Sequence, residues 1–237
     1  MKKGNLYMIP ITIGDIKTDS LKDTPPSSLK AILTIRFFIV ENIKSARRFL
    51  RQLDKNFDID NSVFYLLNKH TKISELNQFI QPCIKGENVG ILSEAGCPGI
   101  ADPGSKITTI AHKENIQVIP LIGPSSIFMA LMSSGLNGQE FTFHGYLPKN
   151  RNERIKKIKE IAKKSIINGA QIFMETPFRN NNLLEDILLN CPENILLCIA
   201  TSISTQEEFI KTKNIKNWKL NYPNLNKKPT IFIFGLN

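Results

Sequence analysis

Hydrophobic and polar residues alternate with two periodicities along the first half of the chain. Short apolar runs rich in Ile, Val and Phe predict strands, and the segments between them carry apolar residues three and four positions apart, as amphipathic helices do. Strands of this kind separated by helices are typical of a largely parallel α/β sheet. The predicted strands are Leu6–Ile13, Phe37–Val40, Ser62–Leu67, Val89–Leu92 and Gln117–Leu121, and the helices are Ser27–Thr34, Ile43–Leu53, Lys72–Lys85 and Gly104–Asn115.

The same alternation resumes after Ile122–Ser126, a segment with Gly, Pro and two Ser. Pro and Ser are common where a helix begins, and the apolar run Ile127–Ser134 follows them. We therefore expect two α/β domains, residues 1–121 and 122–237, with a small-ligand cleft where they meet. The second domain has predicted strands at Phe141–His144, Ala170–Met174, Ile195–Ala200 and Thr230–Phe234, and further helices at Asn152–Asn168 and Asn180–Asn190.

Composition excludes several classes of protein. With 237 residues, 41% of them hydrophobic and 22% charged, the chain is neither disordered, collagen-like nor a coiled coil. Its four cysteines form no C-x-x-C pair and have no histidines at metal-ligand spacing, so we expect no metal and a reduced, cytoplasmic setting. The longest apolar stretch, Ala31–Val40, is interrupted by Arg36 and is shorter than the roughly 20 residues of a membrane span, so we expect no membrane association.

The chain is basic, with 31 Lys and Arg against 21 Asp and Glu and a net charge of +10. This balance permits a polyanionic partner but equally reflects a general preference for Lys, Ile and Asn. Lys149–Lys164 concentrates eight Lys or Arg against Glu153 and Glu160. Such a segment is usually a solvated helix; the alternative is a polyanion-binding face, and both interpretations stay open.

Two loops are candidates for ligand binding. Leu92–Gly104 holds three glycines, two prolines and two acids between a predicted strand and a predicted helix, which favours a ligand-binding loop over a plain connection. It is neither a G-x-G-x-x-G nor a Walker loop. Gly123–Ser126 offers hydroxyls and N–H groups at a helix start, suited equally to an anion or to helix capping. Motifs of serine hydrolases and zinc proteases are absent from the sequence.

Several segments together resemble one protein family. Val89–Gly104 is similar to the V-S-D-A-G-T-P-x-I-S-D-P-G signature of the tetrapyrrole-methylase superfamily, and within it resembles the ribosomal RNA small-subunit methyltransferase I family, which methylates the 2′-oxygen of a cytidine ribose. Four further segments follow in order. Leu6–Gly14 resembles L-Y-I-V-P-T-P-I-G, Ile122–Gly135 resembles G-P-x-A…A-L-x-x-S-G-L, Phe143–Pro148 resembles F-x-G-F-L-P, and Phe173–Arg179 resembles F-Y-E-A-P-H-R.

The resemblance implies a fold, a cofactor and partners. It implies two α/β domains of the tetrapyrrole-methylase type with S-adenosylmethionine in the cleft between them, a ribosomal RNA substrate and a homodimer. The cofactor-binding residues that it implies are Pro10, Ile13, Cys97, Pro98, Ile100, Ser125, Ser126, Ile127, Met174, Glu175, Ala200, Pro229 and Thr230.

The sequence departs from the family mainly in segments expected on the substrate side. The family's E-D-T-R reads Glu41–Lys44, its H-E-H-N-like segment reads Asn68–Thr71, and the acid of S-D-A-G is Glu94. These departures leave open a methyltransferase for a small or tetrapyrrole-like molecule, or a catalytically silent RNA-binding homologue. A ribose hydroxyl needs a base to take its proton. We expect Glu41 and Glu94 to be catalytic, with Glu175 third, and Lys44, His70 and Arg179 to bind substrate.

Overall fold

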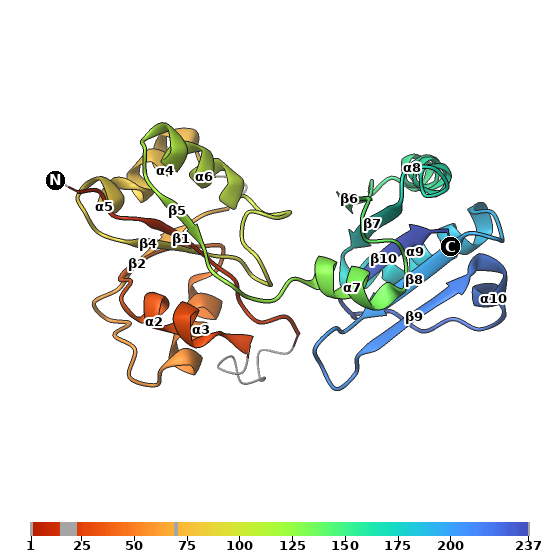
Figure 1. Ribbon diagram of the computed structural model, residues 1–237, viewed down its shortest axis with the longest axis horizontal. Coiled ribbons are helices and arrows are strands. Elements are labelled where there is room, and N and C mark those ends of the chain that lie inside the picture. Colours follow the sequence, from red (N-terminus) through yellow and green to blue (C-terminus); the bar gives the residue numbers. More distant parts are fainter. Residues whose placement is uncertain (1, 15–22, 69–70, 237) are drawn as a thin grey trace. The chain divides into compact units, whose positions relative to one another are not determined.

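The structure is a computed structural model that describes residues 2–14, 23–68 and 71–236. The chain divides into two compact units, Met1–Ser125 and Ser126–Asn237, which are called here the first and second units (Figure 1). The division falls inside the Gly-Pro-Ser segment that the sequence predicts to link two domains. Each unit has its own sheet and its own buried core.

The first unit contains a five-stranded sheet with the strand order β3-β2-β4-β1-β5. Every pairing in this sheet is parallel, which confirms the arrangement that the apolar runs predict. Because the strands are parallel and in register, their carboxyl ends meet at one edge, where Leu92 lies between Ile9 and Val40. The strands are β1 (Leu6–Ile9), β2 (Phe37–Val40), β3 (Val63–Leu66), β4 (Val89–Leu92) and β5 (Val118–Pro120).

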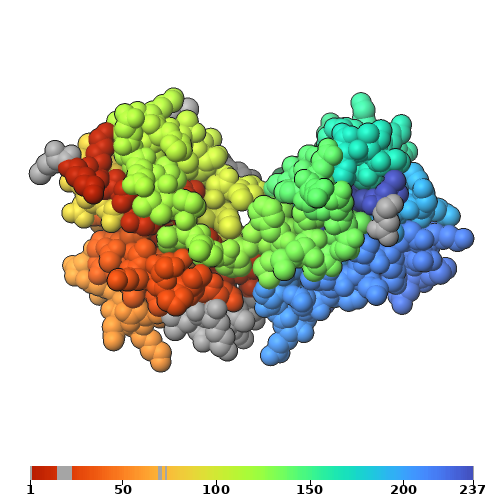
Figure 2. All heavy atoms as spheres, viewed as in Figure 1, coloured from red at the N-terminus to blue at the C-terminus, as the bar shows by residue number. Residues whose placement is uncertain are grey.

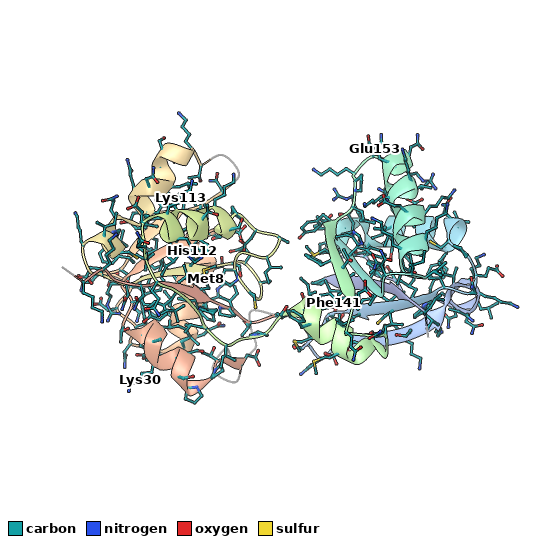
Figure 3. The ribbon with its side chains drawn as sticks, turned by 45° about the horizontal axis from the view of Figure 1, so that its top comes forward. Met8, Lys30, His112, Lys113, Phe141 and Glu153 are labelled. Atoms are coloured by element: carbon teal, nitrogen blue, oxygen red, sulfur yellow. The ribbon has the colours of Figure 1, made fainter. Side chains whose placement is uncertain are left out.

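Helices cover both faces of this sheet (Figure 1). On one face α2 (Pro26–Leu33) and α3 (Ile43–Leu53) pack with buried strand residues such as Phe38. On the other face lie α4 (Ile73–Phe79), α5 (Gln81–Ile84) and α6 (Gly104–Lys113), whose Ile107 is fully buried. In Figure 3, Met8 of β1 and His112 of α6 are labelled on this side of the unit.

Two predicted elements in the first unit have different limits, each because of a proline. The single helix predicted over Lys72–Lys85 is two helices, since Pro82 has no N–H to continue a helix and instead lies in the first turn of α5. The first strand ends at Ile9 rather than Ile13, because the next residue is Pro10. The chain then pairs again at Ile11, in an isolated antiparallel bridge to Gly96.

The second unit contains a mixed sheet with the strand order β6-β7-β10-β8-β9. Its β6 and β7 are parallel, and the other three pairings are antiparallel. β9 lies at one edge and was not among the predicted strands. The strands are β6 (Phe141–Tyr146), β7 (Ala170–Glu175), β8 (Leu196–Thr201), β9 (Phe209–Asn214) and β10 (Thr230–Gly235).

A large apolar core holds the helices of this unit on its sheet. α8 (Arg151–Lys164), α9 (Asn180–Asn190) and α10 (Ile215–Leu220) bury their apolar residues against Phe173 and Phe232, whose rings stack at 5.8 Å. The indole N–H of Trp218 in α10 donates to the carbonyl of Leu197 at 2.8 Å. On the other face α7 (Ser126–Ser134) packs against β8, β9 and β10.

A buried ion cluster fixes the start of α8 on α9. Both oxygens of Asp186, whose side chain is 2% exposed, accept hydrogen bonds from arginines of α8. Arg154 is itself buried and donates twice to Oδ2, whereas Arg151 is mostly exposed and donates to Oδ1 at 2.9 Å. Two of the basic residues of this helix therefore serve its packing.

We predict that Asp186→Asn costs about 3–5 kcal/mol in the free energy of unfolding, because it leaves the buried Arg154 guanidinium without its counter-charge. Urea unfolding followed by the fluorescence of Trp218, the single tryptophan of the chain, measures this in the second unit. Arg151→Gln is the control and should cost less than about 1 kcal/mol, since Arg151 is exposed. Equal losses for both variants would contradict a buried cluster.

Candidate active site

Three loops of the first unit meet at the carboxyl edge of its sheet. Ile11, after β1, exchanges two backbone hydrogen bonds with Gly96, after β4, at 3.0 and 3.1 Å. Gly123, after β5, packs so tightly on Pro10 that a Cβ at this glycine would lie 2.4 Å from Cβ of the proline. In an open α/β sheet the carboxyl edge is where ligands bind, so these contacts shape a candidate site.

The Gly/Pro loop between β4 and α6 is folded around one carboxylate. Asp102 accepts hydrogen bonds from the backbone N–H of Gly99, at 2.8 and 2.9 Å, and of Gly104, at 2.7 Å. Burial raises the pKa of Asp102 above its ordinary value, and the hydrogen bonds from Gly104 and Gly99 oppose that shift. Gly96 and Gly99 have positive φ angles of 66° and 83°, which a side chain would strain. The backbone of this loop is thus open to close approach.

The predicted cofactor residues of the first unit lie along these loops. Ile13 packs on Gly96 and is buried, and Pro98 is also buried. The thiol of Cys97 donates to the carbonyl of Pro124 at 3.4 Å. The structure therefore brings together residues that are more than 100 positions apart in the sequence. Of the remaining residues, Pro10 contacts Gly123, Ile100 is exposed, and Ser125 is half-buried at the end of the unit.

The predicted catalytic acids both follow strands at the same edge. Glu94 accepts a hydrogen bond of 2.6 Å from the Ser45 hydroxyl, in the first turn of α3. Glu41 directly follows β2 and lines a small pocket together with Asp102. Lys44 is exposed in the first turn of α3. His70 lies outside the described residues.

Asn42, which replaces an acid of the family motif, has a clear structural role. Its side chain caps α3 by accepting hydrogen bonds from the backbone N–H of Lys44, at 2.9 Å, and of Ser45, at 3.3 Å. Asn and Asp are both strong N-caps, so this substitution preserves the start of the helix.

A second group of predicted residues gathers at one edge of the other sheet. Thr230, the first residue of β10, pairs with Glu175, at the end of β7, and with Thr201, at the end of β8. The hydroxyl of Thr230 donates to that of Thr201 at 2.9 Å. Met174 and Ala200 lie one position further in, on either side of Ile231, and Pro229 precedes β10. Ser126 and Ile127 begin α7 in the same unit.

Glu175 is the most buried carboxylate at this edge, and it keeps one oxygen without a partner. Its Oε1 accepts from the backbone N–H of Thr176, at 2.6 Å, and from the guanidinium of Arg179, whose pKa this carboxylate raises. Its Oε2, the Nε of Arg179 and the Oδ1 of Asn180 are all buried and unpaired among the described residues. An unpaired buried acceptor costs free energy unless a water or a ligand donates to it.

Sequence reasoning missed three residues that shape these edges: Ser45, Asp102 and Asn180. The position of Asp102 between the glycines of its loop is a signal that identifies it, since short acidic side chains commonly cap neighbouring backbone N–H groups. Nothing in the sequence marks Ser45 or Asn180, because their roles depend on residues distant in the chain, namely Glu94 and Lys228.

Across residues 2–14, 23–68 and 71–236, no cluster of three or more His, Cys, Asp or Glu is arranged to hold a metal ion. Within the same ranges, none of the helices is long and apolar enough to cross a membrane.

Comparison with known proteins identifies the family. No protein-family model matches the chain. Proteins named ribosomal RNA small subunit methyltransferase I match from Halalkalibacterium halodurans (28% identity, covering 88% of this chain and 68% of the relative), from Vibrio cholerae (30%, 77% and 59%) and from Buchnera aphidicola subsp. Schizaphis graminum (30%, 92% and 73%). This chain thus spans about three fifths to three quarters of their lengths.

Solved structures agree on the fold. The methyltransferase CobJ superposes with a TM-score of 0.64 at 14% identity, covering 98% of this chain and 94% of that one. A uroporphyrin-III-C-methyltransferase from Thermus thermophilus superposes with a TM-score of 0.59 at 13% identity, with the same coverage. The fold is therefore that of the tetrapyrrole methylases, and the chain belongs to the ribosomal RNA small subunit methyltransferase I family of methyltransferases.

Proposed function

We propose that this protein transfers a methyl group from S-adenosylmethionine to the 2′-oxygen of a cytidine ribose in small-subunit ribosomal RNA. The observation that carries the proposal is the match, over 92% of the chain, to a relative named for methylation of that RNA. The resemblance of the sequence motifs supplies the cytidine and the 2′-oxygen.

The residues at both sheet edges suit S-adenosylmethionine. Its amino and hydroxyl groups are donors of the kind that the unpaired Oε2 of Glu175 requires. Its carboxylate suits backbone N–H groups at a helix start such as Ser126. The open backbone around Gly96 and Gly99 allows a ligand to approach closely. We propose that these residues hold the cofactor.

S-adenosylmethionine supplies a methyl group on a positively charged sulfur, which leaves as a neutral thioether. The protein has to place the ribose oxygen in line with that methyl group, and positioning of this kind is worth up to about 7–11 kcal/mol. A carboxylate then takes the hydroxyl proton as the new C–O bond forms. Glu94, oriented by Ser45, and Glu41 are the proposed bases.

The basic helix α8 is the proposed contact for the RNA backbone. Lys157 and Lys164 pair with Glu160, and Arg151 and Arg154 pair with Asp186. Three exposed lysines make no ion pair among the described residues: Lys156, Lys159 and Lys163. α8 lies at the surface of its unit, in turquoise in Figure 2, and Glu153 projects from its first turn in Figure 3. These three lysines are therefore the ones available to phosphates.

We predict that calorimetry detects binding of S-adenosylmethionine, undiminished by a metal chelator. Asp102→Ala should weaken binding by about 10- to 100-fold, because charge-assisted hydrogen bonds of roughly 1.5–3 kcal/mol fold the Gly/Pro loop. Asp102→Asn is the matched control. It keeps an Oδ1 that accepts from both Gly99 and Gly104, so most of the affinity should remain.

Absence of binding heat from folded wild-type protein at high cofactor concentration would rule out the cofactor. If the alanine and asparagine variants behave alike, the hydrogen bonds of Asp102 do not organise the site.

We also predict that affinity for small-subunit ribosomal RNA falls steeply with salt, with a log–log slope of about −0.7 to −0.9 per phosphate contact. Replacing Lys156, Lys159 and Lys163 with Gln should flatten that slope by about two to three units, since the variant neutralises fewer phosphates and so releases fewer counterions when it binds. Filter binding at several salt concentrations measures the slope.

The control triple, Lys30, Lys106 and Lys113 to Gln, removes the same charge from the surface of the first unit, where Figure 3 labels Lys30 and Lys113. Its slope should stay close to that of the wild type. Equal effects of the two triples would show that only net charge matters, and affinity that ignores salt would favour a small-molecule acceptor.

A further inference from the structure

An exposed aromatic side chain stands at the edge of the second sheet where Glu175 and Thr230 meet. Phe178 is the central residue of the 3-10 turn Pro177–Arg179, which directly follows Glu175 and Thr176. Its side chain is 73% exposed, although a phenyl ring gains free energy from burial. Single exposed apolar residues are common, so exposure alone assigns no role to this ring. The backbone of the turn and the charges beside it are more informative.

The turn that carries Phe178 is fixed on both sides. Before the turn, Glu175 accepts hydrogen bonds from Thr176 and Arg179 through the same oxygen. Within the turn, the carbonyl of Pro177 accepts from the backbone N–H of Lys227 at 3.0 Å. After it, the side chain of Asn180 donates to the carbonyl of Lys228 at 2.6 Å. The ring is therefore presented by a backbone that is already ordered, which lowers the entropy cost of binding through it.

The surroundings of Phe178 are basic and polar rather than apolar. Arg179 is adjacent, with 31% of its side chain exposed, and Lys227 is exposed on the segment bonded to Pro177. Among the described residues Lys227 makes no ion pair, whereas Lys228 pairs with Glu207 at 3.1 Å. One aromatic ring among cations lacks the broad apolar surface that a protein partner buries. It has the combination by which proteins hold single-stranded RNA, namely a ring for a base and cations for the adjoining phosphates.

We propose that Phe178 stacks on an unpaired base of the RNA acceptor, with Lys227 beside the neighbouring phosphate. This inference rests on the proposed function, because it takes RNA as the acceptor. It adds a base-binding position at the edge of the sheet that ends in Glu175 and Thr230. It also implies that the RNA is held there as a single strand, since bases within a duplex are not free to stack on a side chain.

The test is a comparison of Phe178→Leu with Phe178→Tyr. Leucine keeps an apolar side chain but has no ring, whereas tyrosine keeps the ring. Fluorescence anisotropy measures the affinity of each variant for short single-stranded fragments that tile the small-subunit ribosomal RNA. We expect Phe178→Leu to weaken binding of the preferred fragment by about 5- to 100-fold, and Phe178→Tyr to bind as the wild type does. The salt slope should not change in either variant, because stacking releases no counterions.

An abasic scan identifies the stacked base. Removing each base of the preferred fragment in turn should lower wild-type affinity sharply at one position, and Phe178→Leu should show no further loss there. Affinity of Phe178→Leu equal to that of the wild type would overturn the inference while leaving the proposed function intact. Loss of S-adenosylmethionine binding would overturn it by making Phe178 a cofactor contact, and a changed oligomeric state would do so by making it a contact between copies. A wild-type protein with no affinity for any fragment would overturn the proposed function together with the inference.

Discussion

The close approach of backbone segments at the carboxyl edge of the parallel sheet is the constraint on which the first unit's candidate site depends. The exchange of hydrogen bonds between Ile11 and Gly96 joins the loop after β1 to the loop after β4. Gly123 packs on Pro10 with no space for a Cβ, which joins the loop after β5 to the same place. Side chains at these glycines would separate the loops. The glycines are therefore required first by the packing of the protein on itself and only then by a ligand.

The second unit builds its edge with side chains instead of glycines. Glu175 is held by Thr176 and Arg179 through one oxygen, and its other oxygen is left for a further donor. The same carboxylate fixes the turn that presents Phe178 to solvent. One buried acid thus links the proposed cofactor site to the proposed base-binding position. Basic residues of α8 are likewise divided, because those bound to Asp186 hold the helix while Lys156, Lys159 and Lys163 remain at the surface.

The first sheet was predictable because its strands are short apolar runs buried on both faces, as the β4 residues Val89–Leu92 are. β9 was missed because Phe209–Asn214 is a half-exposed edge strand with alternating lysines, which does not stand out from a loop. The resemblance located Cys97 and Glu175, but not how they are held. The bonds from Ser45 to Glu94 and from Asn180 to Lys228 join residues 49 and 48 positions apart, and no local pattern records such contacts.

The most direct test of the proposed function is methyl transfer in the test tube. Purified protein is incubated with S-adenosylmethionine labelled in its methyl group and with small ribosomal subunits from cells that lack the protein. The label is then mapped by nuclease digestion and by resistance of the labelled position to alkaline cleavage, which a 2′-O-methyl group confers. The proposal predicts label at a cytidine of the ribosomal RNA, in an alkali-resistant linkage. Label on a base, or label on added tetrapyrroles but none on the RNA, would contradict it.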